Sequence, residues 1–554
     1  MPPRTRQIAL AAAIALPLVA GGFVLGSRSA RDSARLFDEV LQYVSVRYVD
    51  SLGTGDLYEK AARGLVREIQ DPYAALYSPK ELTEFTASTG GRYGGLGMLV
   101  EDQEGVVVVS RVYPHTPAEA GGVHEGDRIV AVGERSTHGW RLVQVTDSLK
   151  GTPGTTVAVT FSRPGVPQPI PMKFTRAVIR IPAVPYAIML DGKTGYIPLL
   201  QFNETAAQEV TDAVRKLQSE GARSMVIDLR DDGGGIVGEA ITISNLFLKP
   251  GLEIASVRGR DGPPEIFLAK GQPLAPSIPL VVLINGYTAS ASEIVAGSLQ
   301  DHDRALLVGT TSFGKGLVQS LYPLDGGWAL KLTTAKWYTP SGRSIQKERK
   351  IVDGQLVEVS DSADADGNPH PGLRSGAAGD TAKTTGAVGD STKKARPVFH
   401  SKEGRIVLGG GAITPDVVVR PDTLTGVEQR FLKAVTPKSQ EFYITLYNFS
   451  IVMKDSVRPD FAVTPAWRNT FFTQLAAAGV KVDRALYDSA SPEVDRLIGD
   501  RVARFAFGDS TAKRREIPDD TQLEVALKLL RQVPSQHDLF IVAERQSAKS
   551  AARP

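Results

Sequence analysis

The chain has 554 residues, of which 42% are hydrophobic and 23% are charged, a composition typical of globular proteins. Its length predicts two to four folded units. The 64 basic and 61 acidic residues leave a formal charge of +3, and this near balance argues against nucleic acid as a partner. The sequence contains no cysteine, which excludes disulfides, thiolate nucleophiles and cysteine-ligated zinc.

The N-terminus (residues 1–30) has the pattern of an export signal. Arg4 and Arg6 precede an uncharged apolar run over residues 8–26, about as long as one membrane-spanning helix requires. The segment is either a cleaved signal peptide or an uncleaved anchor, and we favour the anchor because the run is long and a cleavage site is only weakly marked. A buried soluble helix is the third interpretation. An anchored chain would lie in the periplasm or cell envelope, held at the cytoplasmic membrane.

The next stretch, residues 31–90, is predicted to be helical. Apolar residues recur at spacings of three and four, as in Leu36, Val40, Leu41 and Val44. We expect a small helical segment that contributes packing rather than chemistry.

Residues 91–178 change to β-rich character. Apolar runs at 106–109, 129–132 and 157–161 predict strands separated by Gly and Pro. Three phrases follow one another: GLGM at 95–98, then TPAEAGGVHEGDRIVAVGE, then SLKGTPGTTVAVTFSR. Together they resemble a PDZ domain, and we call residues 91–178 the PDZ-like domain.

This resemblance implies a peptide-binding loop. Gly95, Leu96, Gly97 and Met98 would direct their N–H groups at the terminal carboxylate of a peptide, which adds a strand to the sheet edge. Glycine suits such a loop because no Cβ blocks the approach of the backbone. A tight turn is the alternative for the GLG sequence alone. Four apolar residues either line a pocket for the terminal side chain or pack in the core: Leu96, Met98, Val145 and Leu149.

Strands and helices alternate in the following region, residues 179–423. A helix is predicted over 203–221, and short apolar runs at 224–229, 280–285 and 305–308 suit buried parallel strands. This part of the chain is therefore predicted to be an α/β core.

The first chemical motif of this core is DLRDDGGG at residues 228–235. A buried strand gives way to a glycine cluster, which can direct backbone N–H groups at a developing oxyanion. A plain connection from strand to helix explains the pattern equally well.

The second is Ser290, which follows a strand and opens a helix whose free N–H groups can stabilise an anion. Ser290 and Glu293 also have the spacing of a capping box, and this feature alone favours a helix cap over a nucleophile. Thr288 and Ser292 are neighbouring hydroxyls that compete for the same role.

The third is Lys315, between two glycines in FGKGLVQ. A lysine in this setting is usually a solvated turn residue. As a base for a serine it would have to be neutral, which requires its pKa to fall from about 10.4 to near 7, and burial in an apolar site can do this. Gln319 can orient the amine without adding a negative charge.

The order of these motifs resembles the C-terminal processing peptidases, also called tail-specific proteases. The resemblance runs from about Leu36 to Val419, through the PDZ-like domain, DLRDDGGG, GYTASASEIVAGSLQD, GTTSFGKGLVQ and WYTPSGRSI. It implies a ClpP/crotonase-like α/β peptidase core with an inserted PDZ domain, a helical N-terminal segment and a helical C-terminal extension. It also implies a serine endopeptidase that needs no metal or cofactor and acts on exported proteins held by their C-termini.

Residue roles follow from the same resemblance. It implies Ser290 as the nucleophile, Lys315 as the general base and Gln319 as the group that positions the lysine. It further implies an oxyanion hole made by the N–H groups of Ala291 and of a glycine in the DDGGG turn, for which we choose Gly234. The family usually has Asn and Pro where this chain has Asp232 and Gly233, so the geometry of this turn stays open.

Two regions depart from the family pattern. An insertion at about 357–397 is rich in small and polar residues and is expected to be a disordered loop. Residues 424–554 show helical patterns and no motif. This extension either serves dimerisation or the docking of an activating or adaptor protein, or it is a structural cap.

Three other functions are weighed against this one. Ser290 with His302 and Asp301 would make a Ser-His-Asp enzyme, but His302 falls near the far end of the helix that Ser290 opens. A non-catalytic scaffold would bind C-termini without cleaving them. An acyl-CoA enzyme of the crotonase type fits poorly with a PDZ-like domain and export.

Overall fold

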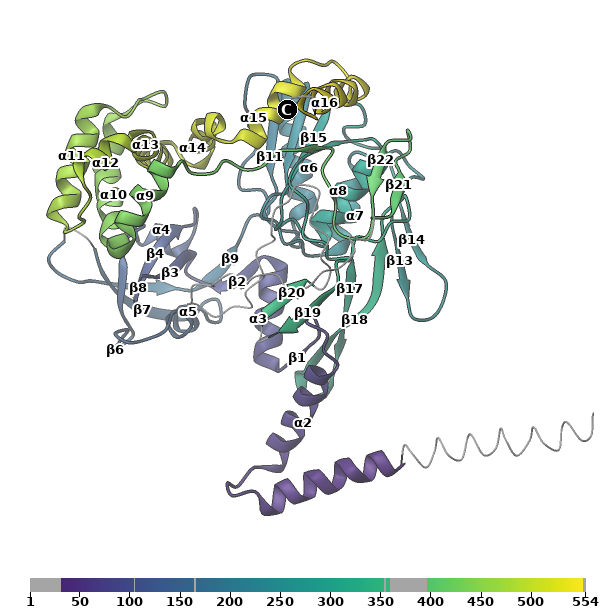
Figure 1. Cartoon of the computed structure of the whole chain (residues 1–554). Helices are drawn as coiled ribbons and strands as arrows, with labels where there is room; N and C mark the ends of the chain where they lie inside the picture. The colour runs from purple at the N-terminus through teal and green to yellow at the C-terminus, as the bar shows by residue number, and fades with distance from the viewer. Residues whose placement is uncertain (1–30, 104, 164–165, 353–354, 359–395, 552–554) are drawn as a thin grey trace, which may run out of the picture. The chain divides into compact units, whose positions relative to one another are not determined.

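The computed structural model describes residues 31–103, 105–163, 166–352, 355–358 and 396–551 (Figure 1). The N-terminal apolar run and most of the insertion expected at 357–397 lie outside these ranges. Within them, no helix is both long and apolar enough to cross a membrane. The described residues form two compact units, a smaller one within 31–78 and Leu321–Leu332 and a larger one within Pro79–Ser320 and 333–551.

The smaller unit combines helices with part of a β-hairpin. Residues 31–47 are helical, and α2 spans Thr54–Glu68. Strand β1 (Ala75–Tyr77) pairs antiparallel with the first residues of β18 (Ala329–Tyr338). The helical N-terminal segment predicted from the spacing of apolar residues is therefore present.

The larger unit contains the PDZ-like domain, which is an antiparallel sheet with the strand order β3-β4-β5-β7-β8. Alternate residues of its strands are buried, as in β7, because one face of the sheet packs on the domain's core. Strand β3 lies at an edge of the sheet. The domain is preceded by α3 (Pro79–Gly90), and β2 pairs with β9 in a separate two-stranded sheet. The elements that follow α3 are β2 (Arg92–Gly95), β3 (Met98–Gln103), β4 (Val106–Val112), α4 (Pro117–Ala120), β5 (Arg128–Val132), β6 (Arg135–Ser136), α5 (Leu142–Leu149), β7 (Thr156–Ser162), β8 (Ile170–Thr175) and β9 (Ala177–Arg180).

The α/β core is organised around a six-stranded sheet with the order β10-β11-β12-β15-β16-β23. Its first pair is antiparallel and the other neighbours are parallel. Every residue of β12, β15 and β16 is buried, which explains why their sequences are continuous apolar runs. The strands are β10 (Ile188–Met189), β11 (Thr194–Pro198), β12 (Ser224–Asp228), β15 (Leu280–Ile284), β16 (Leu306–Gly309) and β23 (Val417–Val418).

Helices cover both faces of this sheet (Figure 1). One face packs against α6 (Ala206–Ser219), α7 (Val237–Asn245) and α8 (Ala291–Asp301). The other packs against α15 (Thr521–Leu530) and α16 (Gln536–Ala551), which belong to the C-terminal extension. Part of this extension is therefore a layer of the α/β core itself.

The remainder of the extension is a separate helical bundle with an aromatic core. Phe431, Phe442, Phe471 and Tyr487 are buried there and meet largely edge to face. A short helix, α14 (Asp509–Glu516), leads from the bundle to α15. The bundle helices are α9 (Gly426–Val435), α10 (Ser439–Met453), α11 (Pro465–Ala477), α12 (Arg484–Ser489) and α13 (Ser491–Phe507).

Further strands lie outside the central sheet. In the larger unit, β13 (Glu253–Gly259) pairs with β14 (Glu265–Leu268) and with the second half of β18. Strand β17 (Leu317–Pro323) begins just after Lys315. Two small hairpins complete the described chain: β19 (Arg349–Val352) with β20 (Gln355–Glu358), and β21 (Val398–His400) with β22 (Ile406–Leu408).

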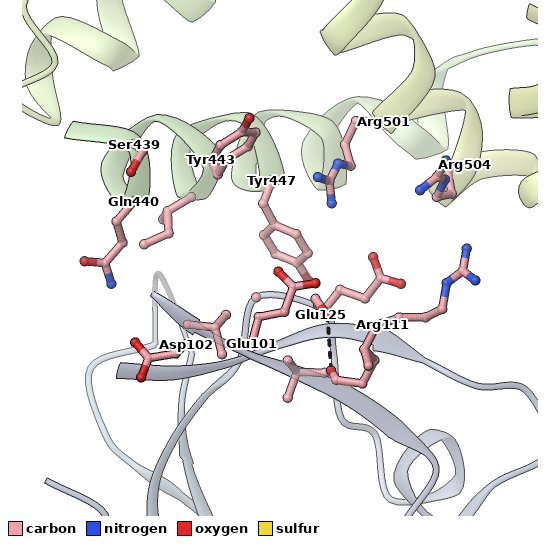
Figure 2. Close-up of a pocket in the computed structure, with 16 residues that line it drawn as sticks. Glu101, Asp102, Arg111, Glu125, Ser439, Gln440, Tyr443, Tyr447, Arg501 and Arg504 are labelled. Atoms are coloured by element: carbon pink, nitrogen blue, oxygen red, sulfur yellow. Dashed lines mark hydrogen bonds between the residues drawn. The ribbon is translucent and has the colours of Figure 1, made fainter. Parts of the chain in front are cut away.

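The helical bundle contacts the PDZ-like domain around a pocket of about 690 Å³ (Figure 2). Arg501 and Arg504 of α13 and the ring of Tyr447 of α10 face residues of the PDZ-like strands and of the adjoining turn. The Tyr447 ring packs on Gly126, where an added Cβ would lie 3.1 Å from the ring. Asp509 accepts a hydrogen bond from Arg111 at 3.0 Å. None of Ser290, Lys315 and Gln319 lines this pocket.

Candidate active site

Ser290 occupies a sharp turn at the start of α8. Its φ of 58° and ψ of −114° are unusual for a residue with a side chain. The residue is partly exposed, and its hydroxyl makes no capping hydrogen bond to the helix. Instead, the N–H of Glu293 donates to the backbone carbonyl of Ser290 at 2.9 Å. The Glu293 N–H is thus satisfied by the backbone and does not depend on the Ser290 hydroxyl.

The two competing hydroxyls are engaged elsewhere. The Thr288 hydroxyl donates to the Leu229 carbonyl at 2.8 Å, and the Ser292 hydroxyl donates to the Asp232 carbonyl at 3.0 Å. Both side chains are fully buried. They hold the turn around residue 290 against the DDGGG turn, which leaves Ser290 as the accessible hydroxyl of the three.

Glu293 joins the serine turn to the lysine loop. Its Oε2 accepts from the N–H of Ser290 at 2.8 Å and from the N–H of Lys315 at 2.9 Å. Its Oε1 accepts from the Ser312 hydroxyl at 2.5 Å and from the Gly314 N–H at 2.7 Å. Burial raises the pKa of the Glu293 carboxyl, and these four donors oppose the shift.

The sequence predicts Glu293 only as the capping-box partner of Ser290. The capping spacing was a correct signal for the bond to Ser290. The bonds from Glu293 to the loop before β17 form because the fold brings this loop next to α8. The spacing of Ser290 and Glu293 in the sequence does not predict these bonds.

The loop that carries Lys315 is packed tightly on both sides. A Cβ on Gly314 would lie 2.7 Å from Cγ of Lys347, and one on Gly316 would lie 2.9 Å from the backbone nitrogen of Gln346. The Phe313 N–H donates to the Thr288 carbonyl at 2.9 Å, a second tie between this loop and the serine turn. The glycines around Lys315 are thus explained by close backbone packing.

Gln319 is the third residue of β17 and is partly buried. Its amide nitrogen lies 3.5 Å from the Thr333 hydroxyl, a weak contact. Lys315 lies two residues before β17, so Gln319 is placed on the strand that directly follows the lysine loop.

The DDGGG turn lies against the nucleophile. A Cβ on Gly234 would lie 2.8 Å from the Ala291 nitrogen and 2.9 Å from Cβ of Ser290, and its φ of 90° also demands glycine. The Gly234 N–H donates to Oδ1 of Asp232 at 2.8 Å. An oxyanion bound by this N–H would have to replace the carboxylate as its acceptor. The N–H of Gly233 makes no hydrogen bond within the part of the chain that the structure describes.

Arg230, just before this turn, is held by a buried network. Its guanidinium donates to Asp228 at 2.6 Å and to Asp520 of the extension at 2.8 Å. Asp228 also accepts from the Tyr196 hydroxyl at 2.7 Å. The pairing with Arg230 holds the pKa of Asp520 well below its usual range, against the opposing effect of burial. The extension is thus tied to the strand end that leads into the turn.

A histidine base for Ser290 does not fit the geometry. His302 is the C-cap of α8, whose 11 residues separate it from Ser290 by roughly 16 Å. Its Nε2 lies 2.6 Å from the Glu253 carbonyl oxygen, and Asp301 forms a buried ion pair with Arg343 at 2.7 Å. This interpretation of Ser290 is wrong.

The predicted peptide-binding loop has ordered backbone geometry. The carbonyls of Leu96 and Gly97 accept from Ala118 and Tyr113 at 2.8 and 2.9 Å. Gly97 has a φ of 84°, and a Cβ there would lie 2.3 Å from the Thr116 side chain. Within the described chain, no hydrogen bond is donated by the N–H groups of Leu96 and Gly97.

The apolar residues considered for a terminal side-chain pocket are buried in the core of the domain. Leu96, Met98, Val145 and Leu149 are each less than a tenth exposed.

Comparison with known proteins assigns the family. Residues 193–354 match peptidase family S41, and residues 85–162 match the PDZ domain family. The chain is 38% identical over 315 residues to the carboxy-terminal-processing protease of Bartonella bacilliformis, an alignment that covers 56% of this chain and 72% of that protein. It is 32% identical over 342 residues to the carboxy-terminal processing protease CtpA of Bacillus subtilis, covering 61% and 73%.

Among solved structures, the photosystem II D1 C-terminal processing protease aligns at 28% identity with a TM-score of 0.34, covering 55% of this chain and 82% of that one. The assignment rests on the sequence relatives and the two matched families. The chain belongs to the carboxy-terminal processing proteases, with an S41 peptidase core and a PDZ domain.

Proposed function

We propose that this protein is a serine endopeptidase in which Ser290 is the nucleophile and Lys315 is its general base, with Gln319 positioning the lysine. The observation that carries the proposal is the shared acceptor: a single oxygen of Glu293 binds the backbone N–H groups of Ser290 and Lys315. Two loops of a buried core are thereby fixed side by side. A nucleophile and a base must be held in this way for proton transfer to be efficient.

The reaction begins with neutral Lys315. Its amine takes the Ser290 proton as Oγ attacks the peptide carbonyl, and the tetrahedral oxyanion accepts hydrogen bonds from the N–H of Ala291 and from Gly234. Ala291 is the first residue of α8, where N–H groups have no partner within the helix. Collapse of the intermediate expels the amine, which takes the proton from Lys315. Water then attacks the ester, with Lys315 again as base, and releases Ser290.

Substrates are recognised through their C-termini by the PDZ domain. The loop Gly95–Met98 supplies N–H groups for the terminal carboxylate, and the edge strand β3 offers a ladder for the residues before it. A protein with an unstructured, apolar C-terminal tail fits this mode of binding.

The proposal includes the location of the enzyme. Arg4, Arg6 and the apolar run that follows them favour export to the cell envelope, with the segment kept as an anchor. The partners are exported proteins with accessible C-termini, and the extension is the part of the chain suited to an adaptor or to a second copy.

Cleavage of a tailed substrate tests the proposal. The full chain is incubated with an unstructured protein that ends in apolar residues, and the fragments are mapped by mass. Ser290→Ala and Lys315→Ala are each expected to lower kcat by at least about a thousandfold. Ser277→Ala and Lys336→Ala, at an exposed serine and an exposed lysine, serve as controls and are expected to retain activity. Amidation of the substrate's C-terminus is expected to raise KM.

Two outcomes contradict the proposal. Undiminished cleavage by either dyad variant would remove the assigned residue from the chemistry. Binding of the substrate by the wild type without any cleavage would instead favour a scaffold.

A further inference from the structure

Asp232 is a buried carboxyl group in the turn beside the nucleophile. Its side chain is fully buried, and its Oδ1 accepts from the Gly234 N–H at 2.8 Å. Its Oδ2 is buried and has no hydrogen-bond partner among the described residues. An ionised carboxylate buried with one oxygen unsatisfied is strongly disfavoured.

The same turn must accommodate a second negative charge in the reaction. Gly234 packs on Ser290 and Ala291, so the oxyanion of the proposed mechanism develops next to the group that Asp232 binds. An ionised Asp232 would compete with the oxyanion for the Gly234 N–H. It would also repel the oxyanion electrostatically, because the two negative charges would lie on either side of Gly234.

Building on the proposed function, we infer that Asp232 is a positioning residue whose protonation state controls oxyanion stabilisation. The protonated acid leaves the turn uncharged and able to stabilise the intermediate. The ionised form blocks the turn. The substitution of the family's usual Asn by Asp thus makes the rate of proteolysis sensitive to pH.

Burial raises the pKa of Asp232 to about 7, against the opposing effect of the Gly234 N–H. The charged groups on the surrounding elements have other partners. Arg230 is bound by Asp228 and Asp520. On α8, Glu293 accepts from four donors of its own, which include the backbone N–H of Lys315.

Asp231, next to Asp232 in the chain, is exposed and bound by the side chain of Asn285 at 2.9 Å. It offers a matched control, because it is a carboxyl group in the same turn that is in contact with water.

The test compares the pH dependence of kcat in the full-length wild type, Asp232→Asn and Asp231→Asn. Asn keeps an oxygen for the Gly234 N–H but carries no charge at any pH. With a pKa of about 7, only about a tenth of Asp232 stays protonated at pH 8. The kcat ratio of Asp232→Asn to wild type is therefore expected to rise from near one at pH 6 to about tenfold at pH 8. Asp231→Asn is expected to follow the wild type. Parallel profiles for Asp232→Asn and wild type would overturn the inference.

Thermal unfolding gives a readout that is independent of cleavage. The folded state holds the Asp232 proton up to about pH 7, whereas the unfolded state releases it near pH 4. The wild type is therefore expected to lose stability relative to Asp232→Asn as the pH rises from about 4 to about 7, and to stay at this lower relative stability above it. A constant difference in Tm across this range would also overturn the inference. Absence of cleavage by every variant would instead count against the proposed function.

Discussion

Two buried carboxyl groups flank Ser290, and they differ in how completely they are satisfied. Glu293 accepts from three backbone N–H groups and one hydroxyl. Asp232 accepts from one N–H and leaves an oxygen without a partner in the described structure. Burial raises the pKa of both. With four donors, Glu293 fixes the geometry of the serine and lysine loops. With only one donor among the described residues, Asp232 is the carboxyl group that can change its charge.

Removal of Glu293 should have the largest effect, because Glu293 fixes the geometry of both loops. Glu293→Ala leaves four donors without an acceptor and is expected to lower the free energy of unfolding by at least about 3 kcal/mol. Since the serine and lysine loops lose their shared anchor, kcat should fall by about a hundredfold or more. Denaturant unfolding and steady-state cleavage measure the two effects.

Glu428→Ala provides the matched control for this experiment. Glu428 accepts from the Thr425 N–H in an exposed capping box on α9. It has the same capping-box spacing as Glu293 but does not bind a second loop in the described part of the chain. Its loss should cost about 1 kcal/mol or less and leave cleavage unchanged. Equal effects at the two positions would mean that Glu293 is only a cap.

Gly234→Ala tests the turn that carries Asp232, the second of the two carboxyl groups compared above. A Cβ at this position would lie 2.5 Å from the Ala289 carbonyl oxygen, which forces the turn away from Ser290. The expected result is a fall in kcat of about a hundredfold, the usual consequence of losing an oxyanion donor.

Gly233→Ala is the matched variant, because its Cβ would meet nothing within 4 Å. It should cleave at nearly the wild-type rate. If both alanine variants were equally impaired, the requirement for glycine would come from chain flexibility and not from contact with the nucleophile.

Asp520→Asn should have the smallest of these effects. The change weakens a pair with Arg230 that is mostly buried, and we expect about 1–3 kcal/mol of lost stability near neutral pH. The pKa of Asp520 is depressed in the folded state, so its contribution is present above the ordinary pKa of about 4 and is lost as the pH falls below it. The stabilities of the variant and the wild type should therefore converge in acid.

Glu524 on α15, whose side chain is 40% exposed, is the control, since its pair with Lys528 is worth little in water. Glu524→Gln should change the stability by less than about 0.5 kcal/mol. Urea unfolding at pH 3 and pH 7 distinguishes the two variants.

Much of this site is visible in the sequence because local patterns encode local geometry. A serine after a buried strand, a lysine between glycines and a glycine-rich turn indicate Ser290, Lys315 and Gly234, and the family comparison agrees with the reaction class. The roles of these three residues remain predictions. The departure at Asp232 is also visible in the sequence, but its burial is not, because the packing of Phe202, Ala289 and α8 around the turn is tertiary.

The extension shows the same limit at a larger scale. Residues 424–554 show helical patterns in the sequence, and α15 is one of the helices that form there. An amphipathic pattern shows that a face is covered and does not identify the surface that covers it. Leu523 and Leu527 pack on Val281 and Leu283 of the central sheet, which no short-range signal in the sequence describes.

This placement of α15 and α16 has a consequence for how the enzyme is made. The strands of the central sheet leave the ribosome long before the helices that cover their second face, and chains emerge from the N-terminus onward. Until residues 521–551 have emerged, one apolar side of the peptidase sheet has no cover from its own chain. The ion pair between Arg230 and Asp520 likewise forms only after residue 520 has been synthesised. During synthesis the PDZ domain can therefore fold before the peptidase core is complete. The order of synthesis delays the completion of the peptidase core.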